Sequence, residues 1–103
     1  MNVQCIVDRK MQLITSTSKY QLYSDGLNHM LKISIPTQTW NVGWTTVDTI
    51  PSAYKDYYPL GSYMFITLVN SLYLNINEKG QIRIGNTSSA SLNRTISNVV
   101  HYV

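Results

Sequence analysis

The sequence predicts an all-β domain of about eight short antiparallel strands, forming a sandwich, a jelly roll or a barrel. Short apolar runs, several alternating with period two, recur between turn residues along the chain. No stretch of a dozen residues shows the helical period with its caps. Charged residues make up only 13% of the chain, whereas Ser, Thr and Asn together supply 30 residues. A chain of 103 residues corresponds to one domain, residues 1–103.

The N-terminal third is expected to hold three strands. The segment from Val3 to Thr15 alternates loosely and breaks at residues 8–10, which predicts two strands joined by a turn. Tyr20 to Tyr23 forms the third strand, and Ser24-Asp25-Gly26 provides a strong turn signal after it. Cys5 lies in the first apolar run, so we expect a buried structural thiol and no disulfide within the chain.

The middle of the chain is expected to hold two further strands. His29 to Ile35 alternates between apolar and polar side chains, and Pro36 is expected to end that strand. Residues 36–43 are expected to be irregular. Trp44 to Thr49 forms the next strand, and a tyrosine-rich loop follows over residues 50–59.

Four strands are expected in the last forty residues. Tyr63 to Val69 is almost continuously apolar, which predicts a central strand that is covered on both faces. The remaining expected elements are a hairpin of Leu72–Ile76 and Gln81–Ile84 with a turn at residues 77–80, a polar loop over residues 85–93, and a last strand from Thr95 to Val103.

The hairpin can be interpreted residue by residue. Its alternation assigns Leu72, Leu74, Ile76, Ile82 and Ile84 to the core, and it turns Tyr73, Asn75 and Arg83 outward. The turn length sets Asn75 opposite Arg83. A ring, an amide and a guanidinium on one rigid face suit the apolar face and the hydroxyls of a glycan. The same residues would also serve as an ordinary solvated strand face.

Several other classes of function receive no support from the sequence. The net charge of +3 is scattered, with one basic doublet at Arg9-Lys10, so nucleic-acid binding is not expected. The chain lacks both an apolar run of membrane-spanning length and a signal-peptide pattern. The five carboxylates are not paired for acid–base catalysis, and His29 and His101 lack metal-ligand spacing. We therefore expect no enzyme activity, no cofactor and no metal.

The order of motifs from Trp44 onward resembles the order found in one known protein family. The order begins with Trp44, Ile50-Pro51-Ser52-Ala53-Tyr54 and Pro59. It continues with an apolar strand, a glycine-turn hairpin and a final strand that includes Tyr102. This order is similar to that of C-terminal head domains of siphophage tail receptor-binding proteins, as found in phages of lactococci and related hosts. The resemblance covers about residues 40–103.

The resemblance implies a fold, partners and a location. Such heads are Greek-key antiparallel β-barrels that assemble as homotrimers at the distal tip of the phage tail, as part of the baseplate. The chain would then be a head excised from a longer fibre protein. The resemblance also implies that it recognises a host cell-wall saccharide, including phosphate-bearing ones, to mediate adsorption.

The resemblance further implies site residues. In related heads the pocket has a His-x-Asp pair on one strand, a Trp on the next and an Arg near the C-terminus. Tyr73-x-Asn75 stands at the place of the pair, Arg83 lies near the place of the Trp, and Arg94 matches the late Arg. Only Arg94 matches by residue type, which puts an identical ligand in doubt.

The sequence therefore predicts saccharide binding. Tyr73 would stack or hydrogen-bond, Asn75 would bond hydroxyls, Arg83 and Arg94 would hold anionic or hydroxyl groups, and Trp44 with the tyrosine loop would form the rim. Three alternatives remain open: a trimerising fibre tip without a ligand, a bacterial carbohydrate-binding module, and a small glycan-degrading domain. Whether Trp40 or Trp44 is exposed is also open.

Overall fold

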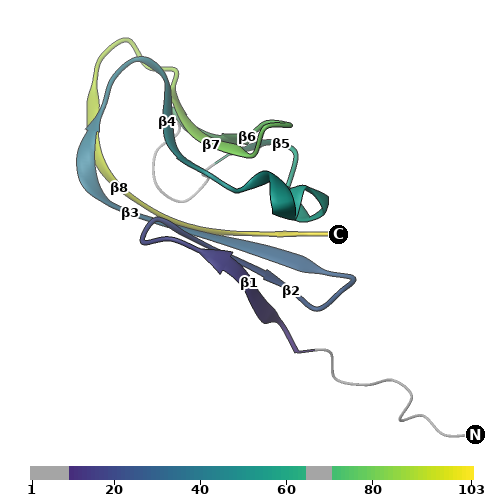
Figure 1. Cartoon of the computed structure of the whole chain (residues 1–103). Coiled ribbons are helices and arrows are strands. Elements are labelled where there is room, and N and C mark those ends of the chain that lie inside the picture. The colour runs from purple at the N-terminus through teal and green to yellow at the C-terminus, as the bar shows by residue number, and fades with distance from the viewer. Residues whose placement is uncertain (1–9, 65–70) are drawn as a thin grey trace, which may run out of the picture.

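The computed structural model describes residues 10–64 and 71–103, and most of these residues lie in antiparallel β-sheet (Figure 1). The described elements are β1 (Gln12–Ser16), β2 (Tyr20–Ser24), β3 (His29–Trp40), β4 (Gly43–Thr49), the 3-10 helix η2 (Ser52–Tyr57), β5 (Gly61–Met64), β6 (Leu72–Ile76), β7 (Gln81–Asn86) and β8 (Leu92–Tyr102). The predicted all-β fold is confirmed.

The strands form two four-stranded sheets. Sheet A has the order β1-β2-β3-β8, and sheet B has the order β4-β7-β6-β5, with every neighbouring pair antiparallel. The chain passes from sheet A to sheet B between β3 and β4, and it returns between β7 and β8. In sheet B three strands joined in succession, β5, β6 and β7, have β4 beside β7, which is the Greek-key order.

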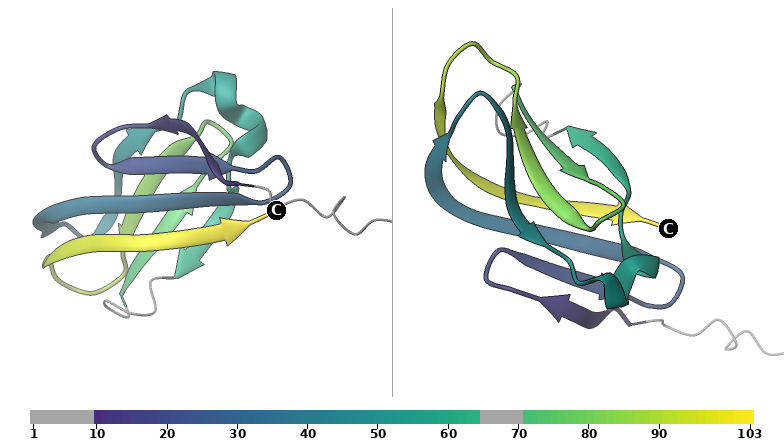
Figure 2. Two further views of the ribbon diagram at one scale, coloured as in Figure 1. Left: turned by 90° about the horizontal axis from the view of Figure 1, so that it is seen from below. Right: turned by 45° about the horizontal axis from the view of Figure 1, so that its top comes forward.

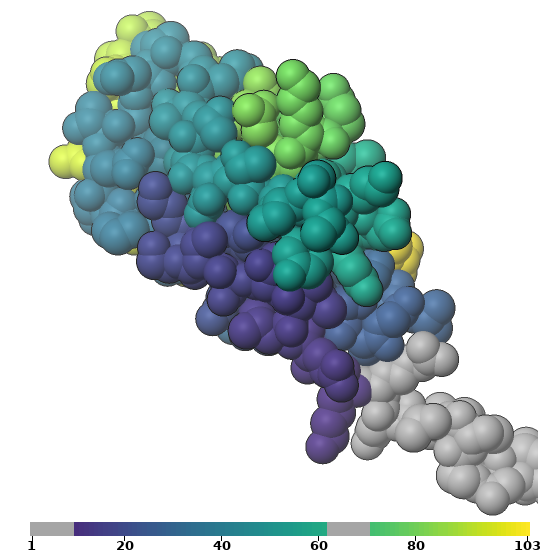
Figure 3. All heavy atoms as spheres, in the orientation of Figure 1, coloured from purple at the N-terminus to yellow at the C-terminus, as the bar shows by residue number. Residues whose placement is uncertain are grey.

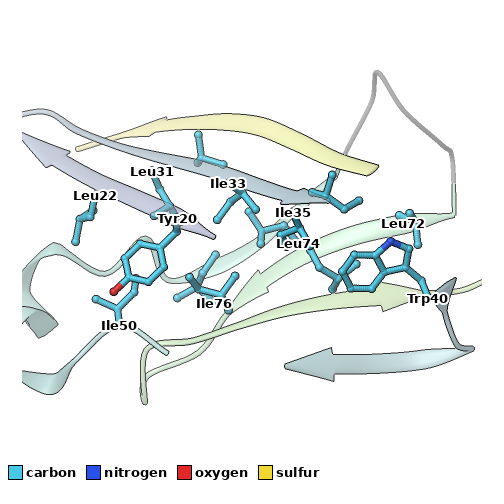
Figure 4. Close-up of a cluster of buried hydrophobic side chains, with 14 residues drawn as sticks. Tyr20, Leu22, Leu31, Ile33, Ile35, Trp40, Ile50, Leu72, Leu74 and Ile76 are labelled. Atoms are coloured by element: carbon cyan, nitrogen blue, oxygen red, sulfur yellow. The ribbon is translucent and has the colours of Figure 1, made fainter. Parts of the chain in front are cut away.

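The two sheets pack face to face as a sandwich (Figure 2). The predicted barrel is wrong, because a barrel needs hydrogen bonds that close one sheet on itself, and no strand pair in the described ranges joins sheet A to sheet B. The apolar core lies between the sheets, from Tyr20 and Ile50 at one end to Trp40 and Leu72 at the other (Figure 4).

Strand β3 does not end at Pro36, so that prediction is wrong. It continues to Trp40, and residues 36–40 are extended rather than irregular. The register between β3 and β8 shifts between Ile35 and Gln38, and the pairing of β2 with β3 has already ended at Ile33. Pro36 therefore sits where no ladder hydrogen bond is needed, which is where a strand tolerates proline.

Two other boundaries also differ from the prediction. Because β3 is longer than expected, β8 begins at Leu92, which pairs with Trp40, rather than at Thr95. The predicted central strand is represented by β5, which forms an edge of sheet B; residues 65–69 of that prediction lie outside the described residues. The predicted strand before residue 8 and the role of Cys5 lie outside them as well.

The predicted hairpin is confirmed as β6 and β7. Its five core positions, namely Leu72, Leu74, Ile76, Ile82 and Ile84, are all buried. Gly80 ends the turn with a φ of +76°, a backbone conformation that glycine adopts without strain.

In the described part of the chain, no helix is both long enough and apolar enough to cross a membrane.

Candidate functional site

The outer face of sheet B carries two rows of side chains that run across β4, β7 and β6. Trp44 pairs with Gly85, and Gly85 pairs with Tyr73, which gives the first row. Thr46, Arg83 and Asn75 form the second row in the same way. These positions alternate with the buried core residues of β6 and β7, so both rows face away from the core. We call this surface the sheet B face.

Trp44 lies over Gly85. A Cβ atom at Gly85 would come within 2.6 Å of the Trp44 ring, and Gly85 is not among the glycines with positive φ. The glycine is therefore needed for space rather than for backbone conformation. The indole remains 50% exposed, whereas Trp40 is 1% exposed and donates from its ring N–H to the Arg94 carbonyl. Trp44 is thus the tryptophan that meets solvent.

Arg83 connects Trp44 to Asn75. Its Nε and Nη2 donate to Asn75 Oδ1 at 3.0 and 2.5 Å, and its guanidinium carbon lies 5.1 Å from the centroid of the Trp44 ring. The predicted pairing of Asn75 with Arg83 is confirmed. Since the amide oxygen accepts two bonds from Arg83, Asn75 holds the guanidinium in place beside the indole.

Arg83 keeps donors for a ligand. A guanidinium has five N–H groups, and two of them donate to Asn75. The other three find no hydrogen-bond partner within the described ranges. They lie next to the half-exposed indole, so the sheet B face offers an aromatic surface with charged donors at its side.

Arg94 does not belong to this face. It lies on β8 in sheet A, opposite Gln38, and its exposed guanidinium donates from Nη1 to the Asn93 carbonyl at 2.8 Å. The structure therefore brings together Trp44, Tyr73, Asn75 and Arg83, and it places Arg94 on the other sheet.

The predicted rim loop folds into η2 and packs against the core. Tyr54, Tyr57 and Tyr58 are partly buried there. The Tyr58 hydroxyl donates to the Ile50 carbonyl at 2.7 Å, and the Tyr102 hydroxyl donates to the Tyr57 carbonyl at 2.6 Å. These contacts give the tyrosines a structural role in closing one end of the sandwich.

Sequence reasoning missed Gly85 and the contact between Trp44 and Arg83. The available signal was a glycine inside a strand, which often marks the close approach of another group. No group of His, Cys, Asp or Glu suited to a metal ion occurs among the residues that the structure describes.

Comparison of the chain with protein-family models, with curated proteins and with solved structures found no match. The similarity to phage receptor-binding heads therefore stays a prediction from the order of motifs.

Proposed function

We propose that the sheet B face binds a saccharide without cleaving it. The observation that supports this most directly is the half-exposed Trp44 indole, which lies on Gly85 with Arg83 beside it. Asn75 holds Arg83 through two hydrogen bonds, so the face is ordered before a ligand arrives. An ordered site loses less conformational entropy on binding than a flexible one.

The chemistry of the face fits a sugar ring. A pyranose presents a face of C–H groups, which packs on an indole, and its hydroxyls accept hydrogen bonds from a guanidinium. Trp44 supplies the aromatic surface, and Arg83 donates from the N–H groups that Asn75 does not use. Tyr73, half-buried in the row of Gly85, extends the surface toward β5.

In the wider proposal, the chain is the head domain of a phage tail receptor-binding protein and mediates adsorption to a host cell-wall saccharide. The resemblance of residues 40–103 supports this context, as does the Greek-key order of sheet B. The head would act as a homotrimer at the distal tip of the tail. Three weak sites in one trimer would then raise the apparent affinity through avidity.

Tryptophan fluorescence tests the site. Because Trp40 is buried, a change in emission on adding purified wall polysaccharide or a panel of glycans reports chiefly on Trp44. Trp44→Ala should weaken binding about tenfold or more, as measured by calorimetry. Gly85→Ala keeps the indole but displaces it, and should also weaken binding. Val42→Ala, which truncates another exposed apolar side chain, is the matched control.

Three outcomes would count against the proposal. Absence of binding across the glycan panel and the wall polysaccharide would refute saccharide recognition. Unchanged affinity in Trp44→Ala would remove the sheet B face as the site. A shortened polymer after incubation would contradict binding without cleavage. If the protein sedimented as a monomer, only the proposed homotrimer would be overturned.

A further inference from the structure

The outer face of sheet A has a hollow where the β1–β2 hairpin ends and β3 and β8 continue past it. β2 begins at Tyr20, opposite Ile33, and the hollow forms at this step. Its volume is about 410 Å³, within the range of small-ligand sites. The polar residues that line it include Lys19, Gln21, Lys32, Ser34 and Ser97.

The register places these side chains in rows. Gln21 pairs with Lys32, and Lys32 pairs with Val99, while Ser34 pairs with Ser97. All five are exposed, and they alternate with buried core residues along their strands. The hollow therefore opens to solvent on the side of the molecule that is opposite to the sheet B face.

Two lysines line the hollow, and their ammonium groups have different neighbours. The Lys19 ammonium donates to the Val47 carbonyl at 3.1 Å, and the Lys32 ammonium lies 5.9 Å from the centroid of the Tyr23 ring. Neither lysine forms an ion pair with a carboxylate in the described part of the chain, and no carboxylate lines the hollow.

One carboxylate, that of Asp48, is hydrogen-bonded to a residue that lines the hollow. The Thr17 hydroxyl donates to the Asp48 carboxylate at 2.5 Å, in the seam where the β1–β2 hairpin (purple) lies against β4 and η2 (teal) in Figure 3. Asp48 accepts from Thr17 and from the Thr49 backbone N–H, and within the described ranges it forms no ion pair with either lysine.

Two hydroxyls in the hollow have no hydrogen-bond partner among the residues that the structure describes. Neither the Ser34 nor the Ser97 side chain forms a hydrogen bond within the described ranges. Both stand on one row beside Lys32, so they can donate to and accept from ligand hydroxyls while the ammonium meets a negative group. Gln21 adds amide donors, since its oxygen already accepts from the Tyr23 hydroxyl.

We propose that this hollow is a second binding site, and that its ligand is an anionic sugar: a hexose that carries a phosphate, sulfate or carboxylate group. The lysines would bind the anion, and the serines and Gln21 would bind the ring hydroxyls. Nucleic acid fits less well, because its binding surfaces carry a stripe of basic residues, whereas the described lining of this hollow includes two lysines and no arginine. This site is independent of the sheet B face.

NMR titration of the full chain tests the proposal. Glucose 6-phosphate and glucuronate should shift the backbone amides of Ser34 and Ser97, and neutral glucose should do so much less. Lys32→Gln should weaken binding about threefold, and Lys19→Gln with Lys32→Gln together about tenfold. Lys79→Gln, in the β6–β7 turn, removes an exposed charge elsewhere and is the matched control. Binding should also weaken as ionic strength rises.

Each possible result of these experiments bears on a different part of the proposal. Equal shifts by neutral glucose would overturn the role of the anion. Equal binding of inorganic phosphate would overturn the role of the sugar. Unchanged affinity in Lys32→Gln would overturn the site. Trp44→Ala should leave these shifts intact, so failure here and failure of the sheet B face are distinguishable.

Discussion

Single residues decide which side chains meet solvent on the sheet B face. Gly85 has no side chain, and for that reason the Trp44 indole can lie close against β7. The indole then lies within cation–π distance of Arg83, which Asn75 orients. A substitution at any one of these four positions changes the environment of the others, so their effects on binding are expected to be non-additive.

Tyr20 provides a prediction about pH. Its side chain is 2% exposed, and its hydroxyl has no hydrogen-bond partner in the described structure. Burial raises the pKa of Tyr20 above its ordinary value of 10.0, and the nearby Thr15 hydroxyl offsets this only in part. The unfolded chain therefore loses this proton first, so the contribution to stability is complete below pH 10.0 and declines as the pH rises through the folded-state pKa.

Tyr20→Phe removes both the titrating group and the unpaired hydroxyl. At pH 7 the free energy of unfolding should stay the same or rise by about 1 kcal/mol. Above pH 10.0 it should fall less steeply than in the unmodified protein. Urea unfolding at several pH values measures both effects, and Tyr23→Phe on the outer face is the control. A loss of more than about 2 kcal/mol at pH 7 would mean that the hydroxyl has a partner.

At the scale of elements, the β6–β7 hairpin is the most self-contained unit. Its alternating pattern, its turn length and its glycine all favour the same hairpin. Within the turn, the Asn77 side-chain oxygen accepts hydrogen bonds from the backbone N–H groups of Lys79 and Gln81. Gly80 also meets a distant segment, because its carbonyl accepts from the Ile50 N–H at 2.8 Å. The turn therefore connects the hairpin to the loop that leads into η2.

Gly80→Ala should destabilise the protein for two reasons. The φ of +76° disfavours a Cβ, and that Cβ would lie 2.5 Å from the Ile50 carbonyl oxygen and 2.6 Å from the Tyr58 ring. We expect a loss of about 3 kcal/mol in the free energy of unfolding. Gly43→Ala has a positive φ but open space around it, so it should lose only about 1 kcal/mol. Equal losses would show that the contacts at Gly80 contribute nothing.

At the scale of the whole molecule, side chains connect sheet A to sheet B at one end and to η2 at the other. At one end Asn86 of sheet B, 2% exposed, donates to the carbonyls of Trp40 and Ala90 at 2.8 and 3.0 Å. At the other end Tyr102 of sheet A donates to Tyr57, and His29 packs against both rings. These contacts fix how the sheets stack.

Asn86→Ala should cost about 2–4 kcal/mol of stability, because it leaves the Trp40 carbonyl without this donor and opens space in a buried site. Chemical denaturation followed by circular dichroism measures the loss. Asn93→Ala removes an exposed amide on β8 and should change stability by less than about 0.5 kcal/mol. If the two variants unfolded alike, the link between the sheets would not depend on Asn86.

The sequence by itself determined the all-β class, most strands, the core of the β6–β7 hairpin and the pairing of Asn75 with Arg83. These follow from local alternation and turn length, which act over a few residues. The tertiary structure alone decided that Pro36 lies within a strand, that Trp44 covers Gly85, and that Arg94 lies on the other sheet. Each depends on which strands become neighbours, and burial of the whole core between two sheets sets that order.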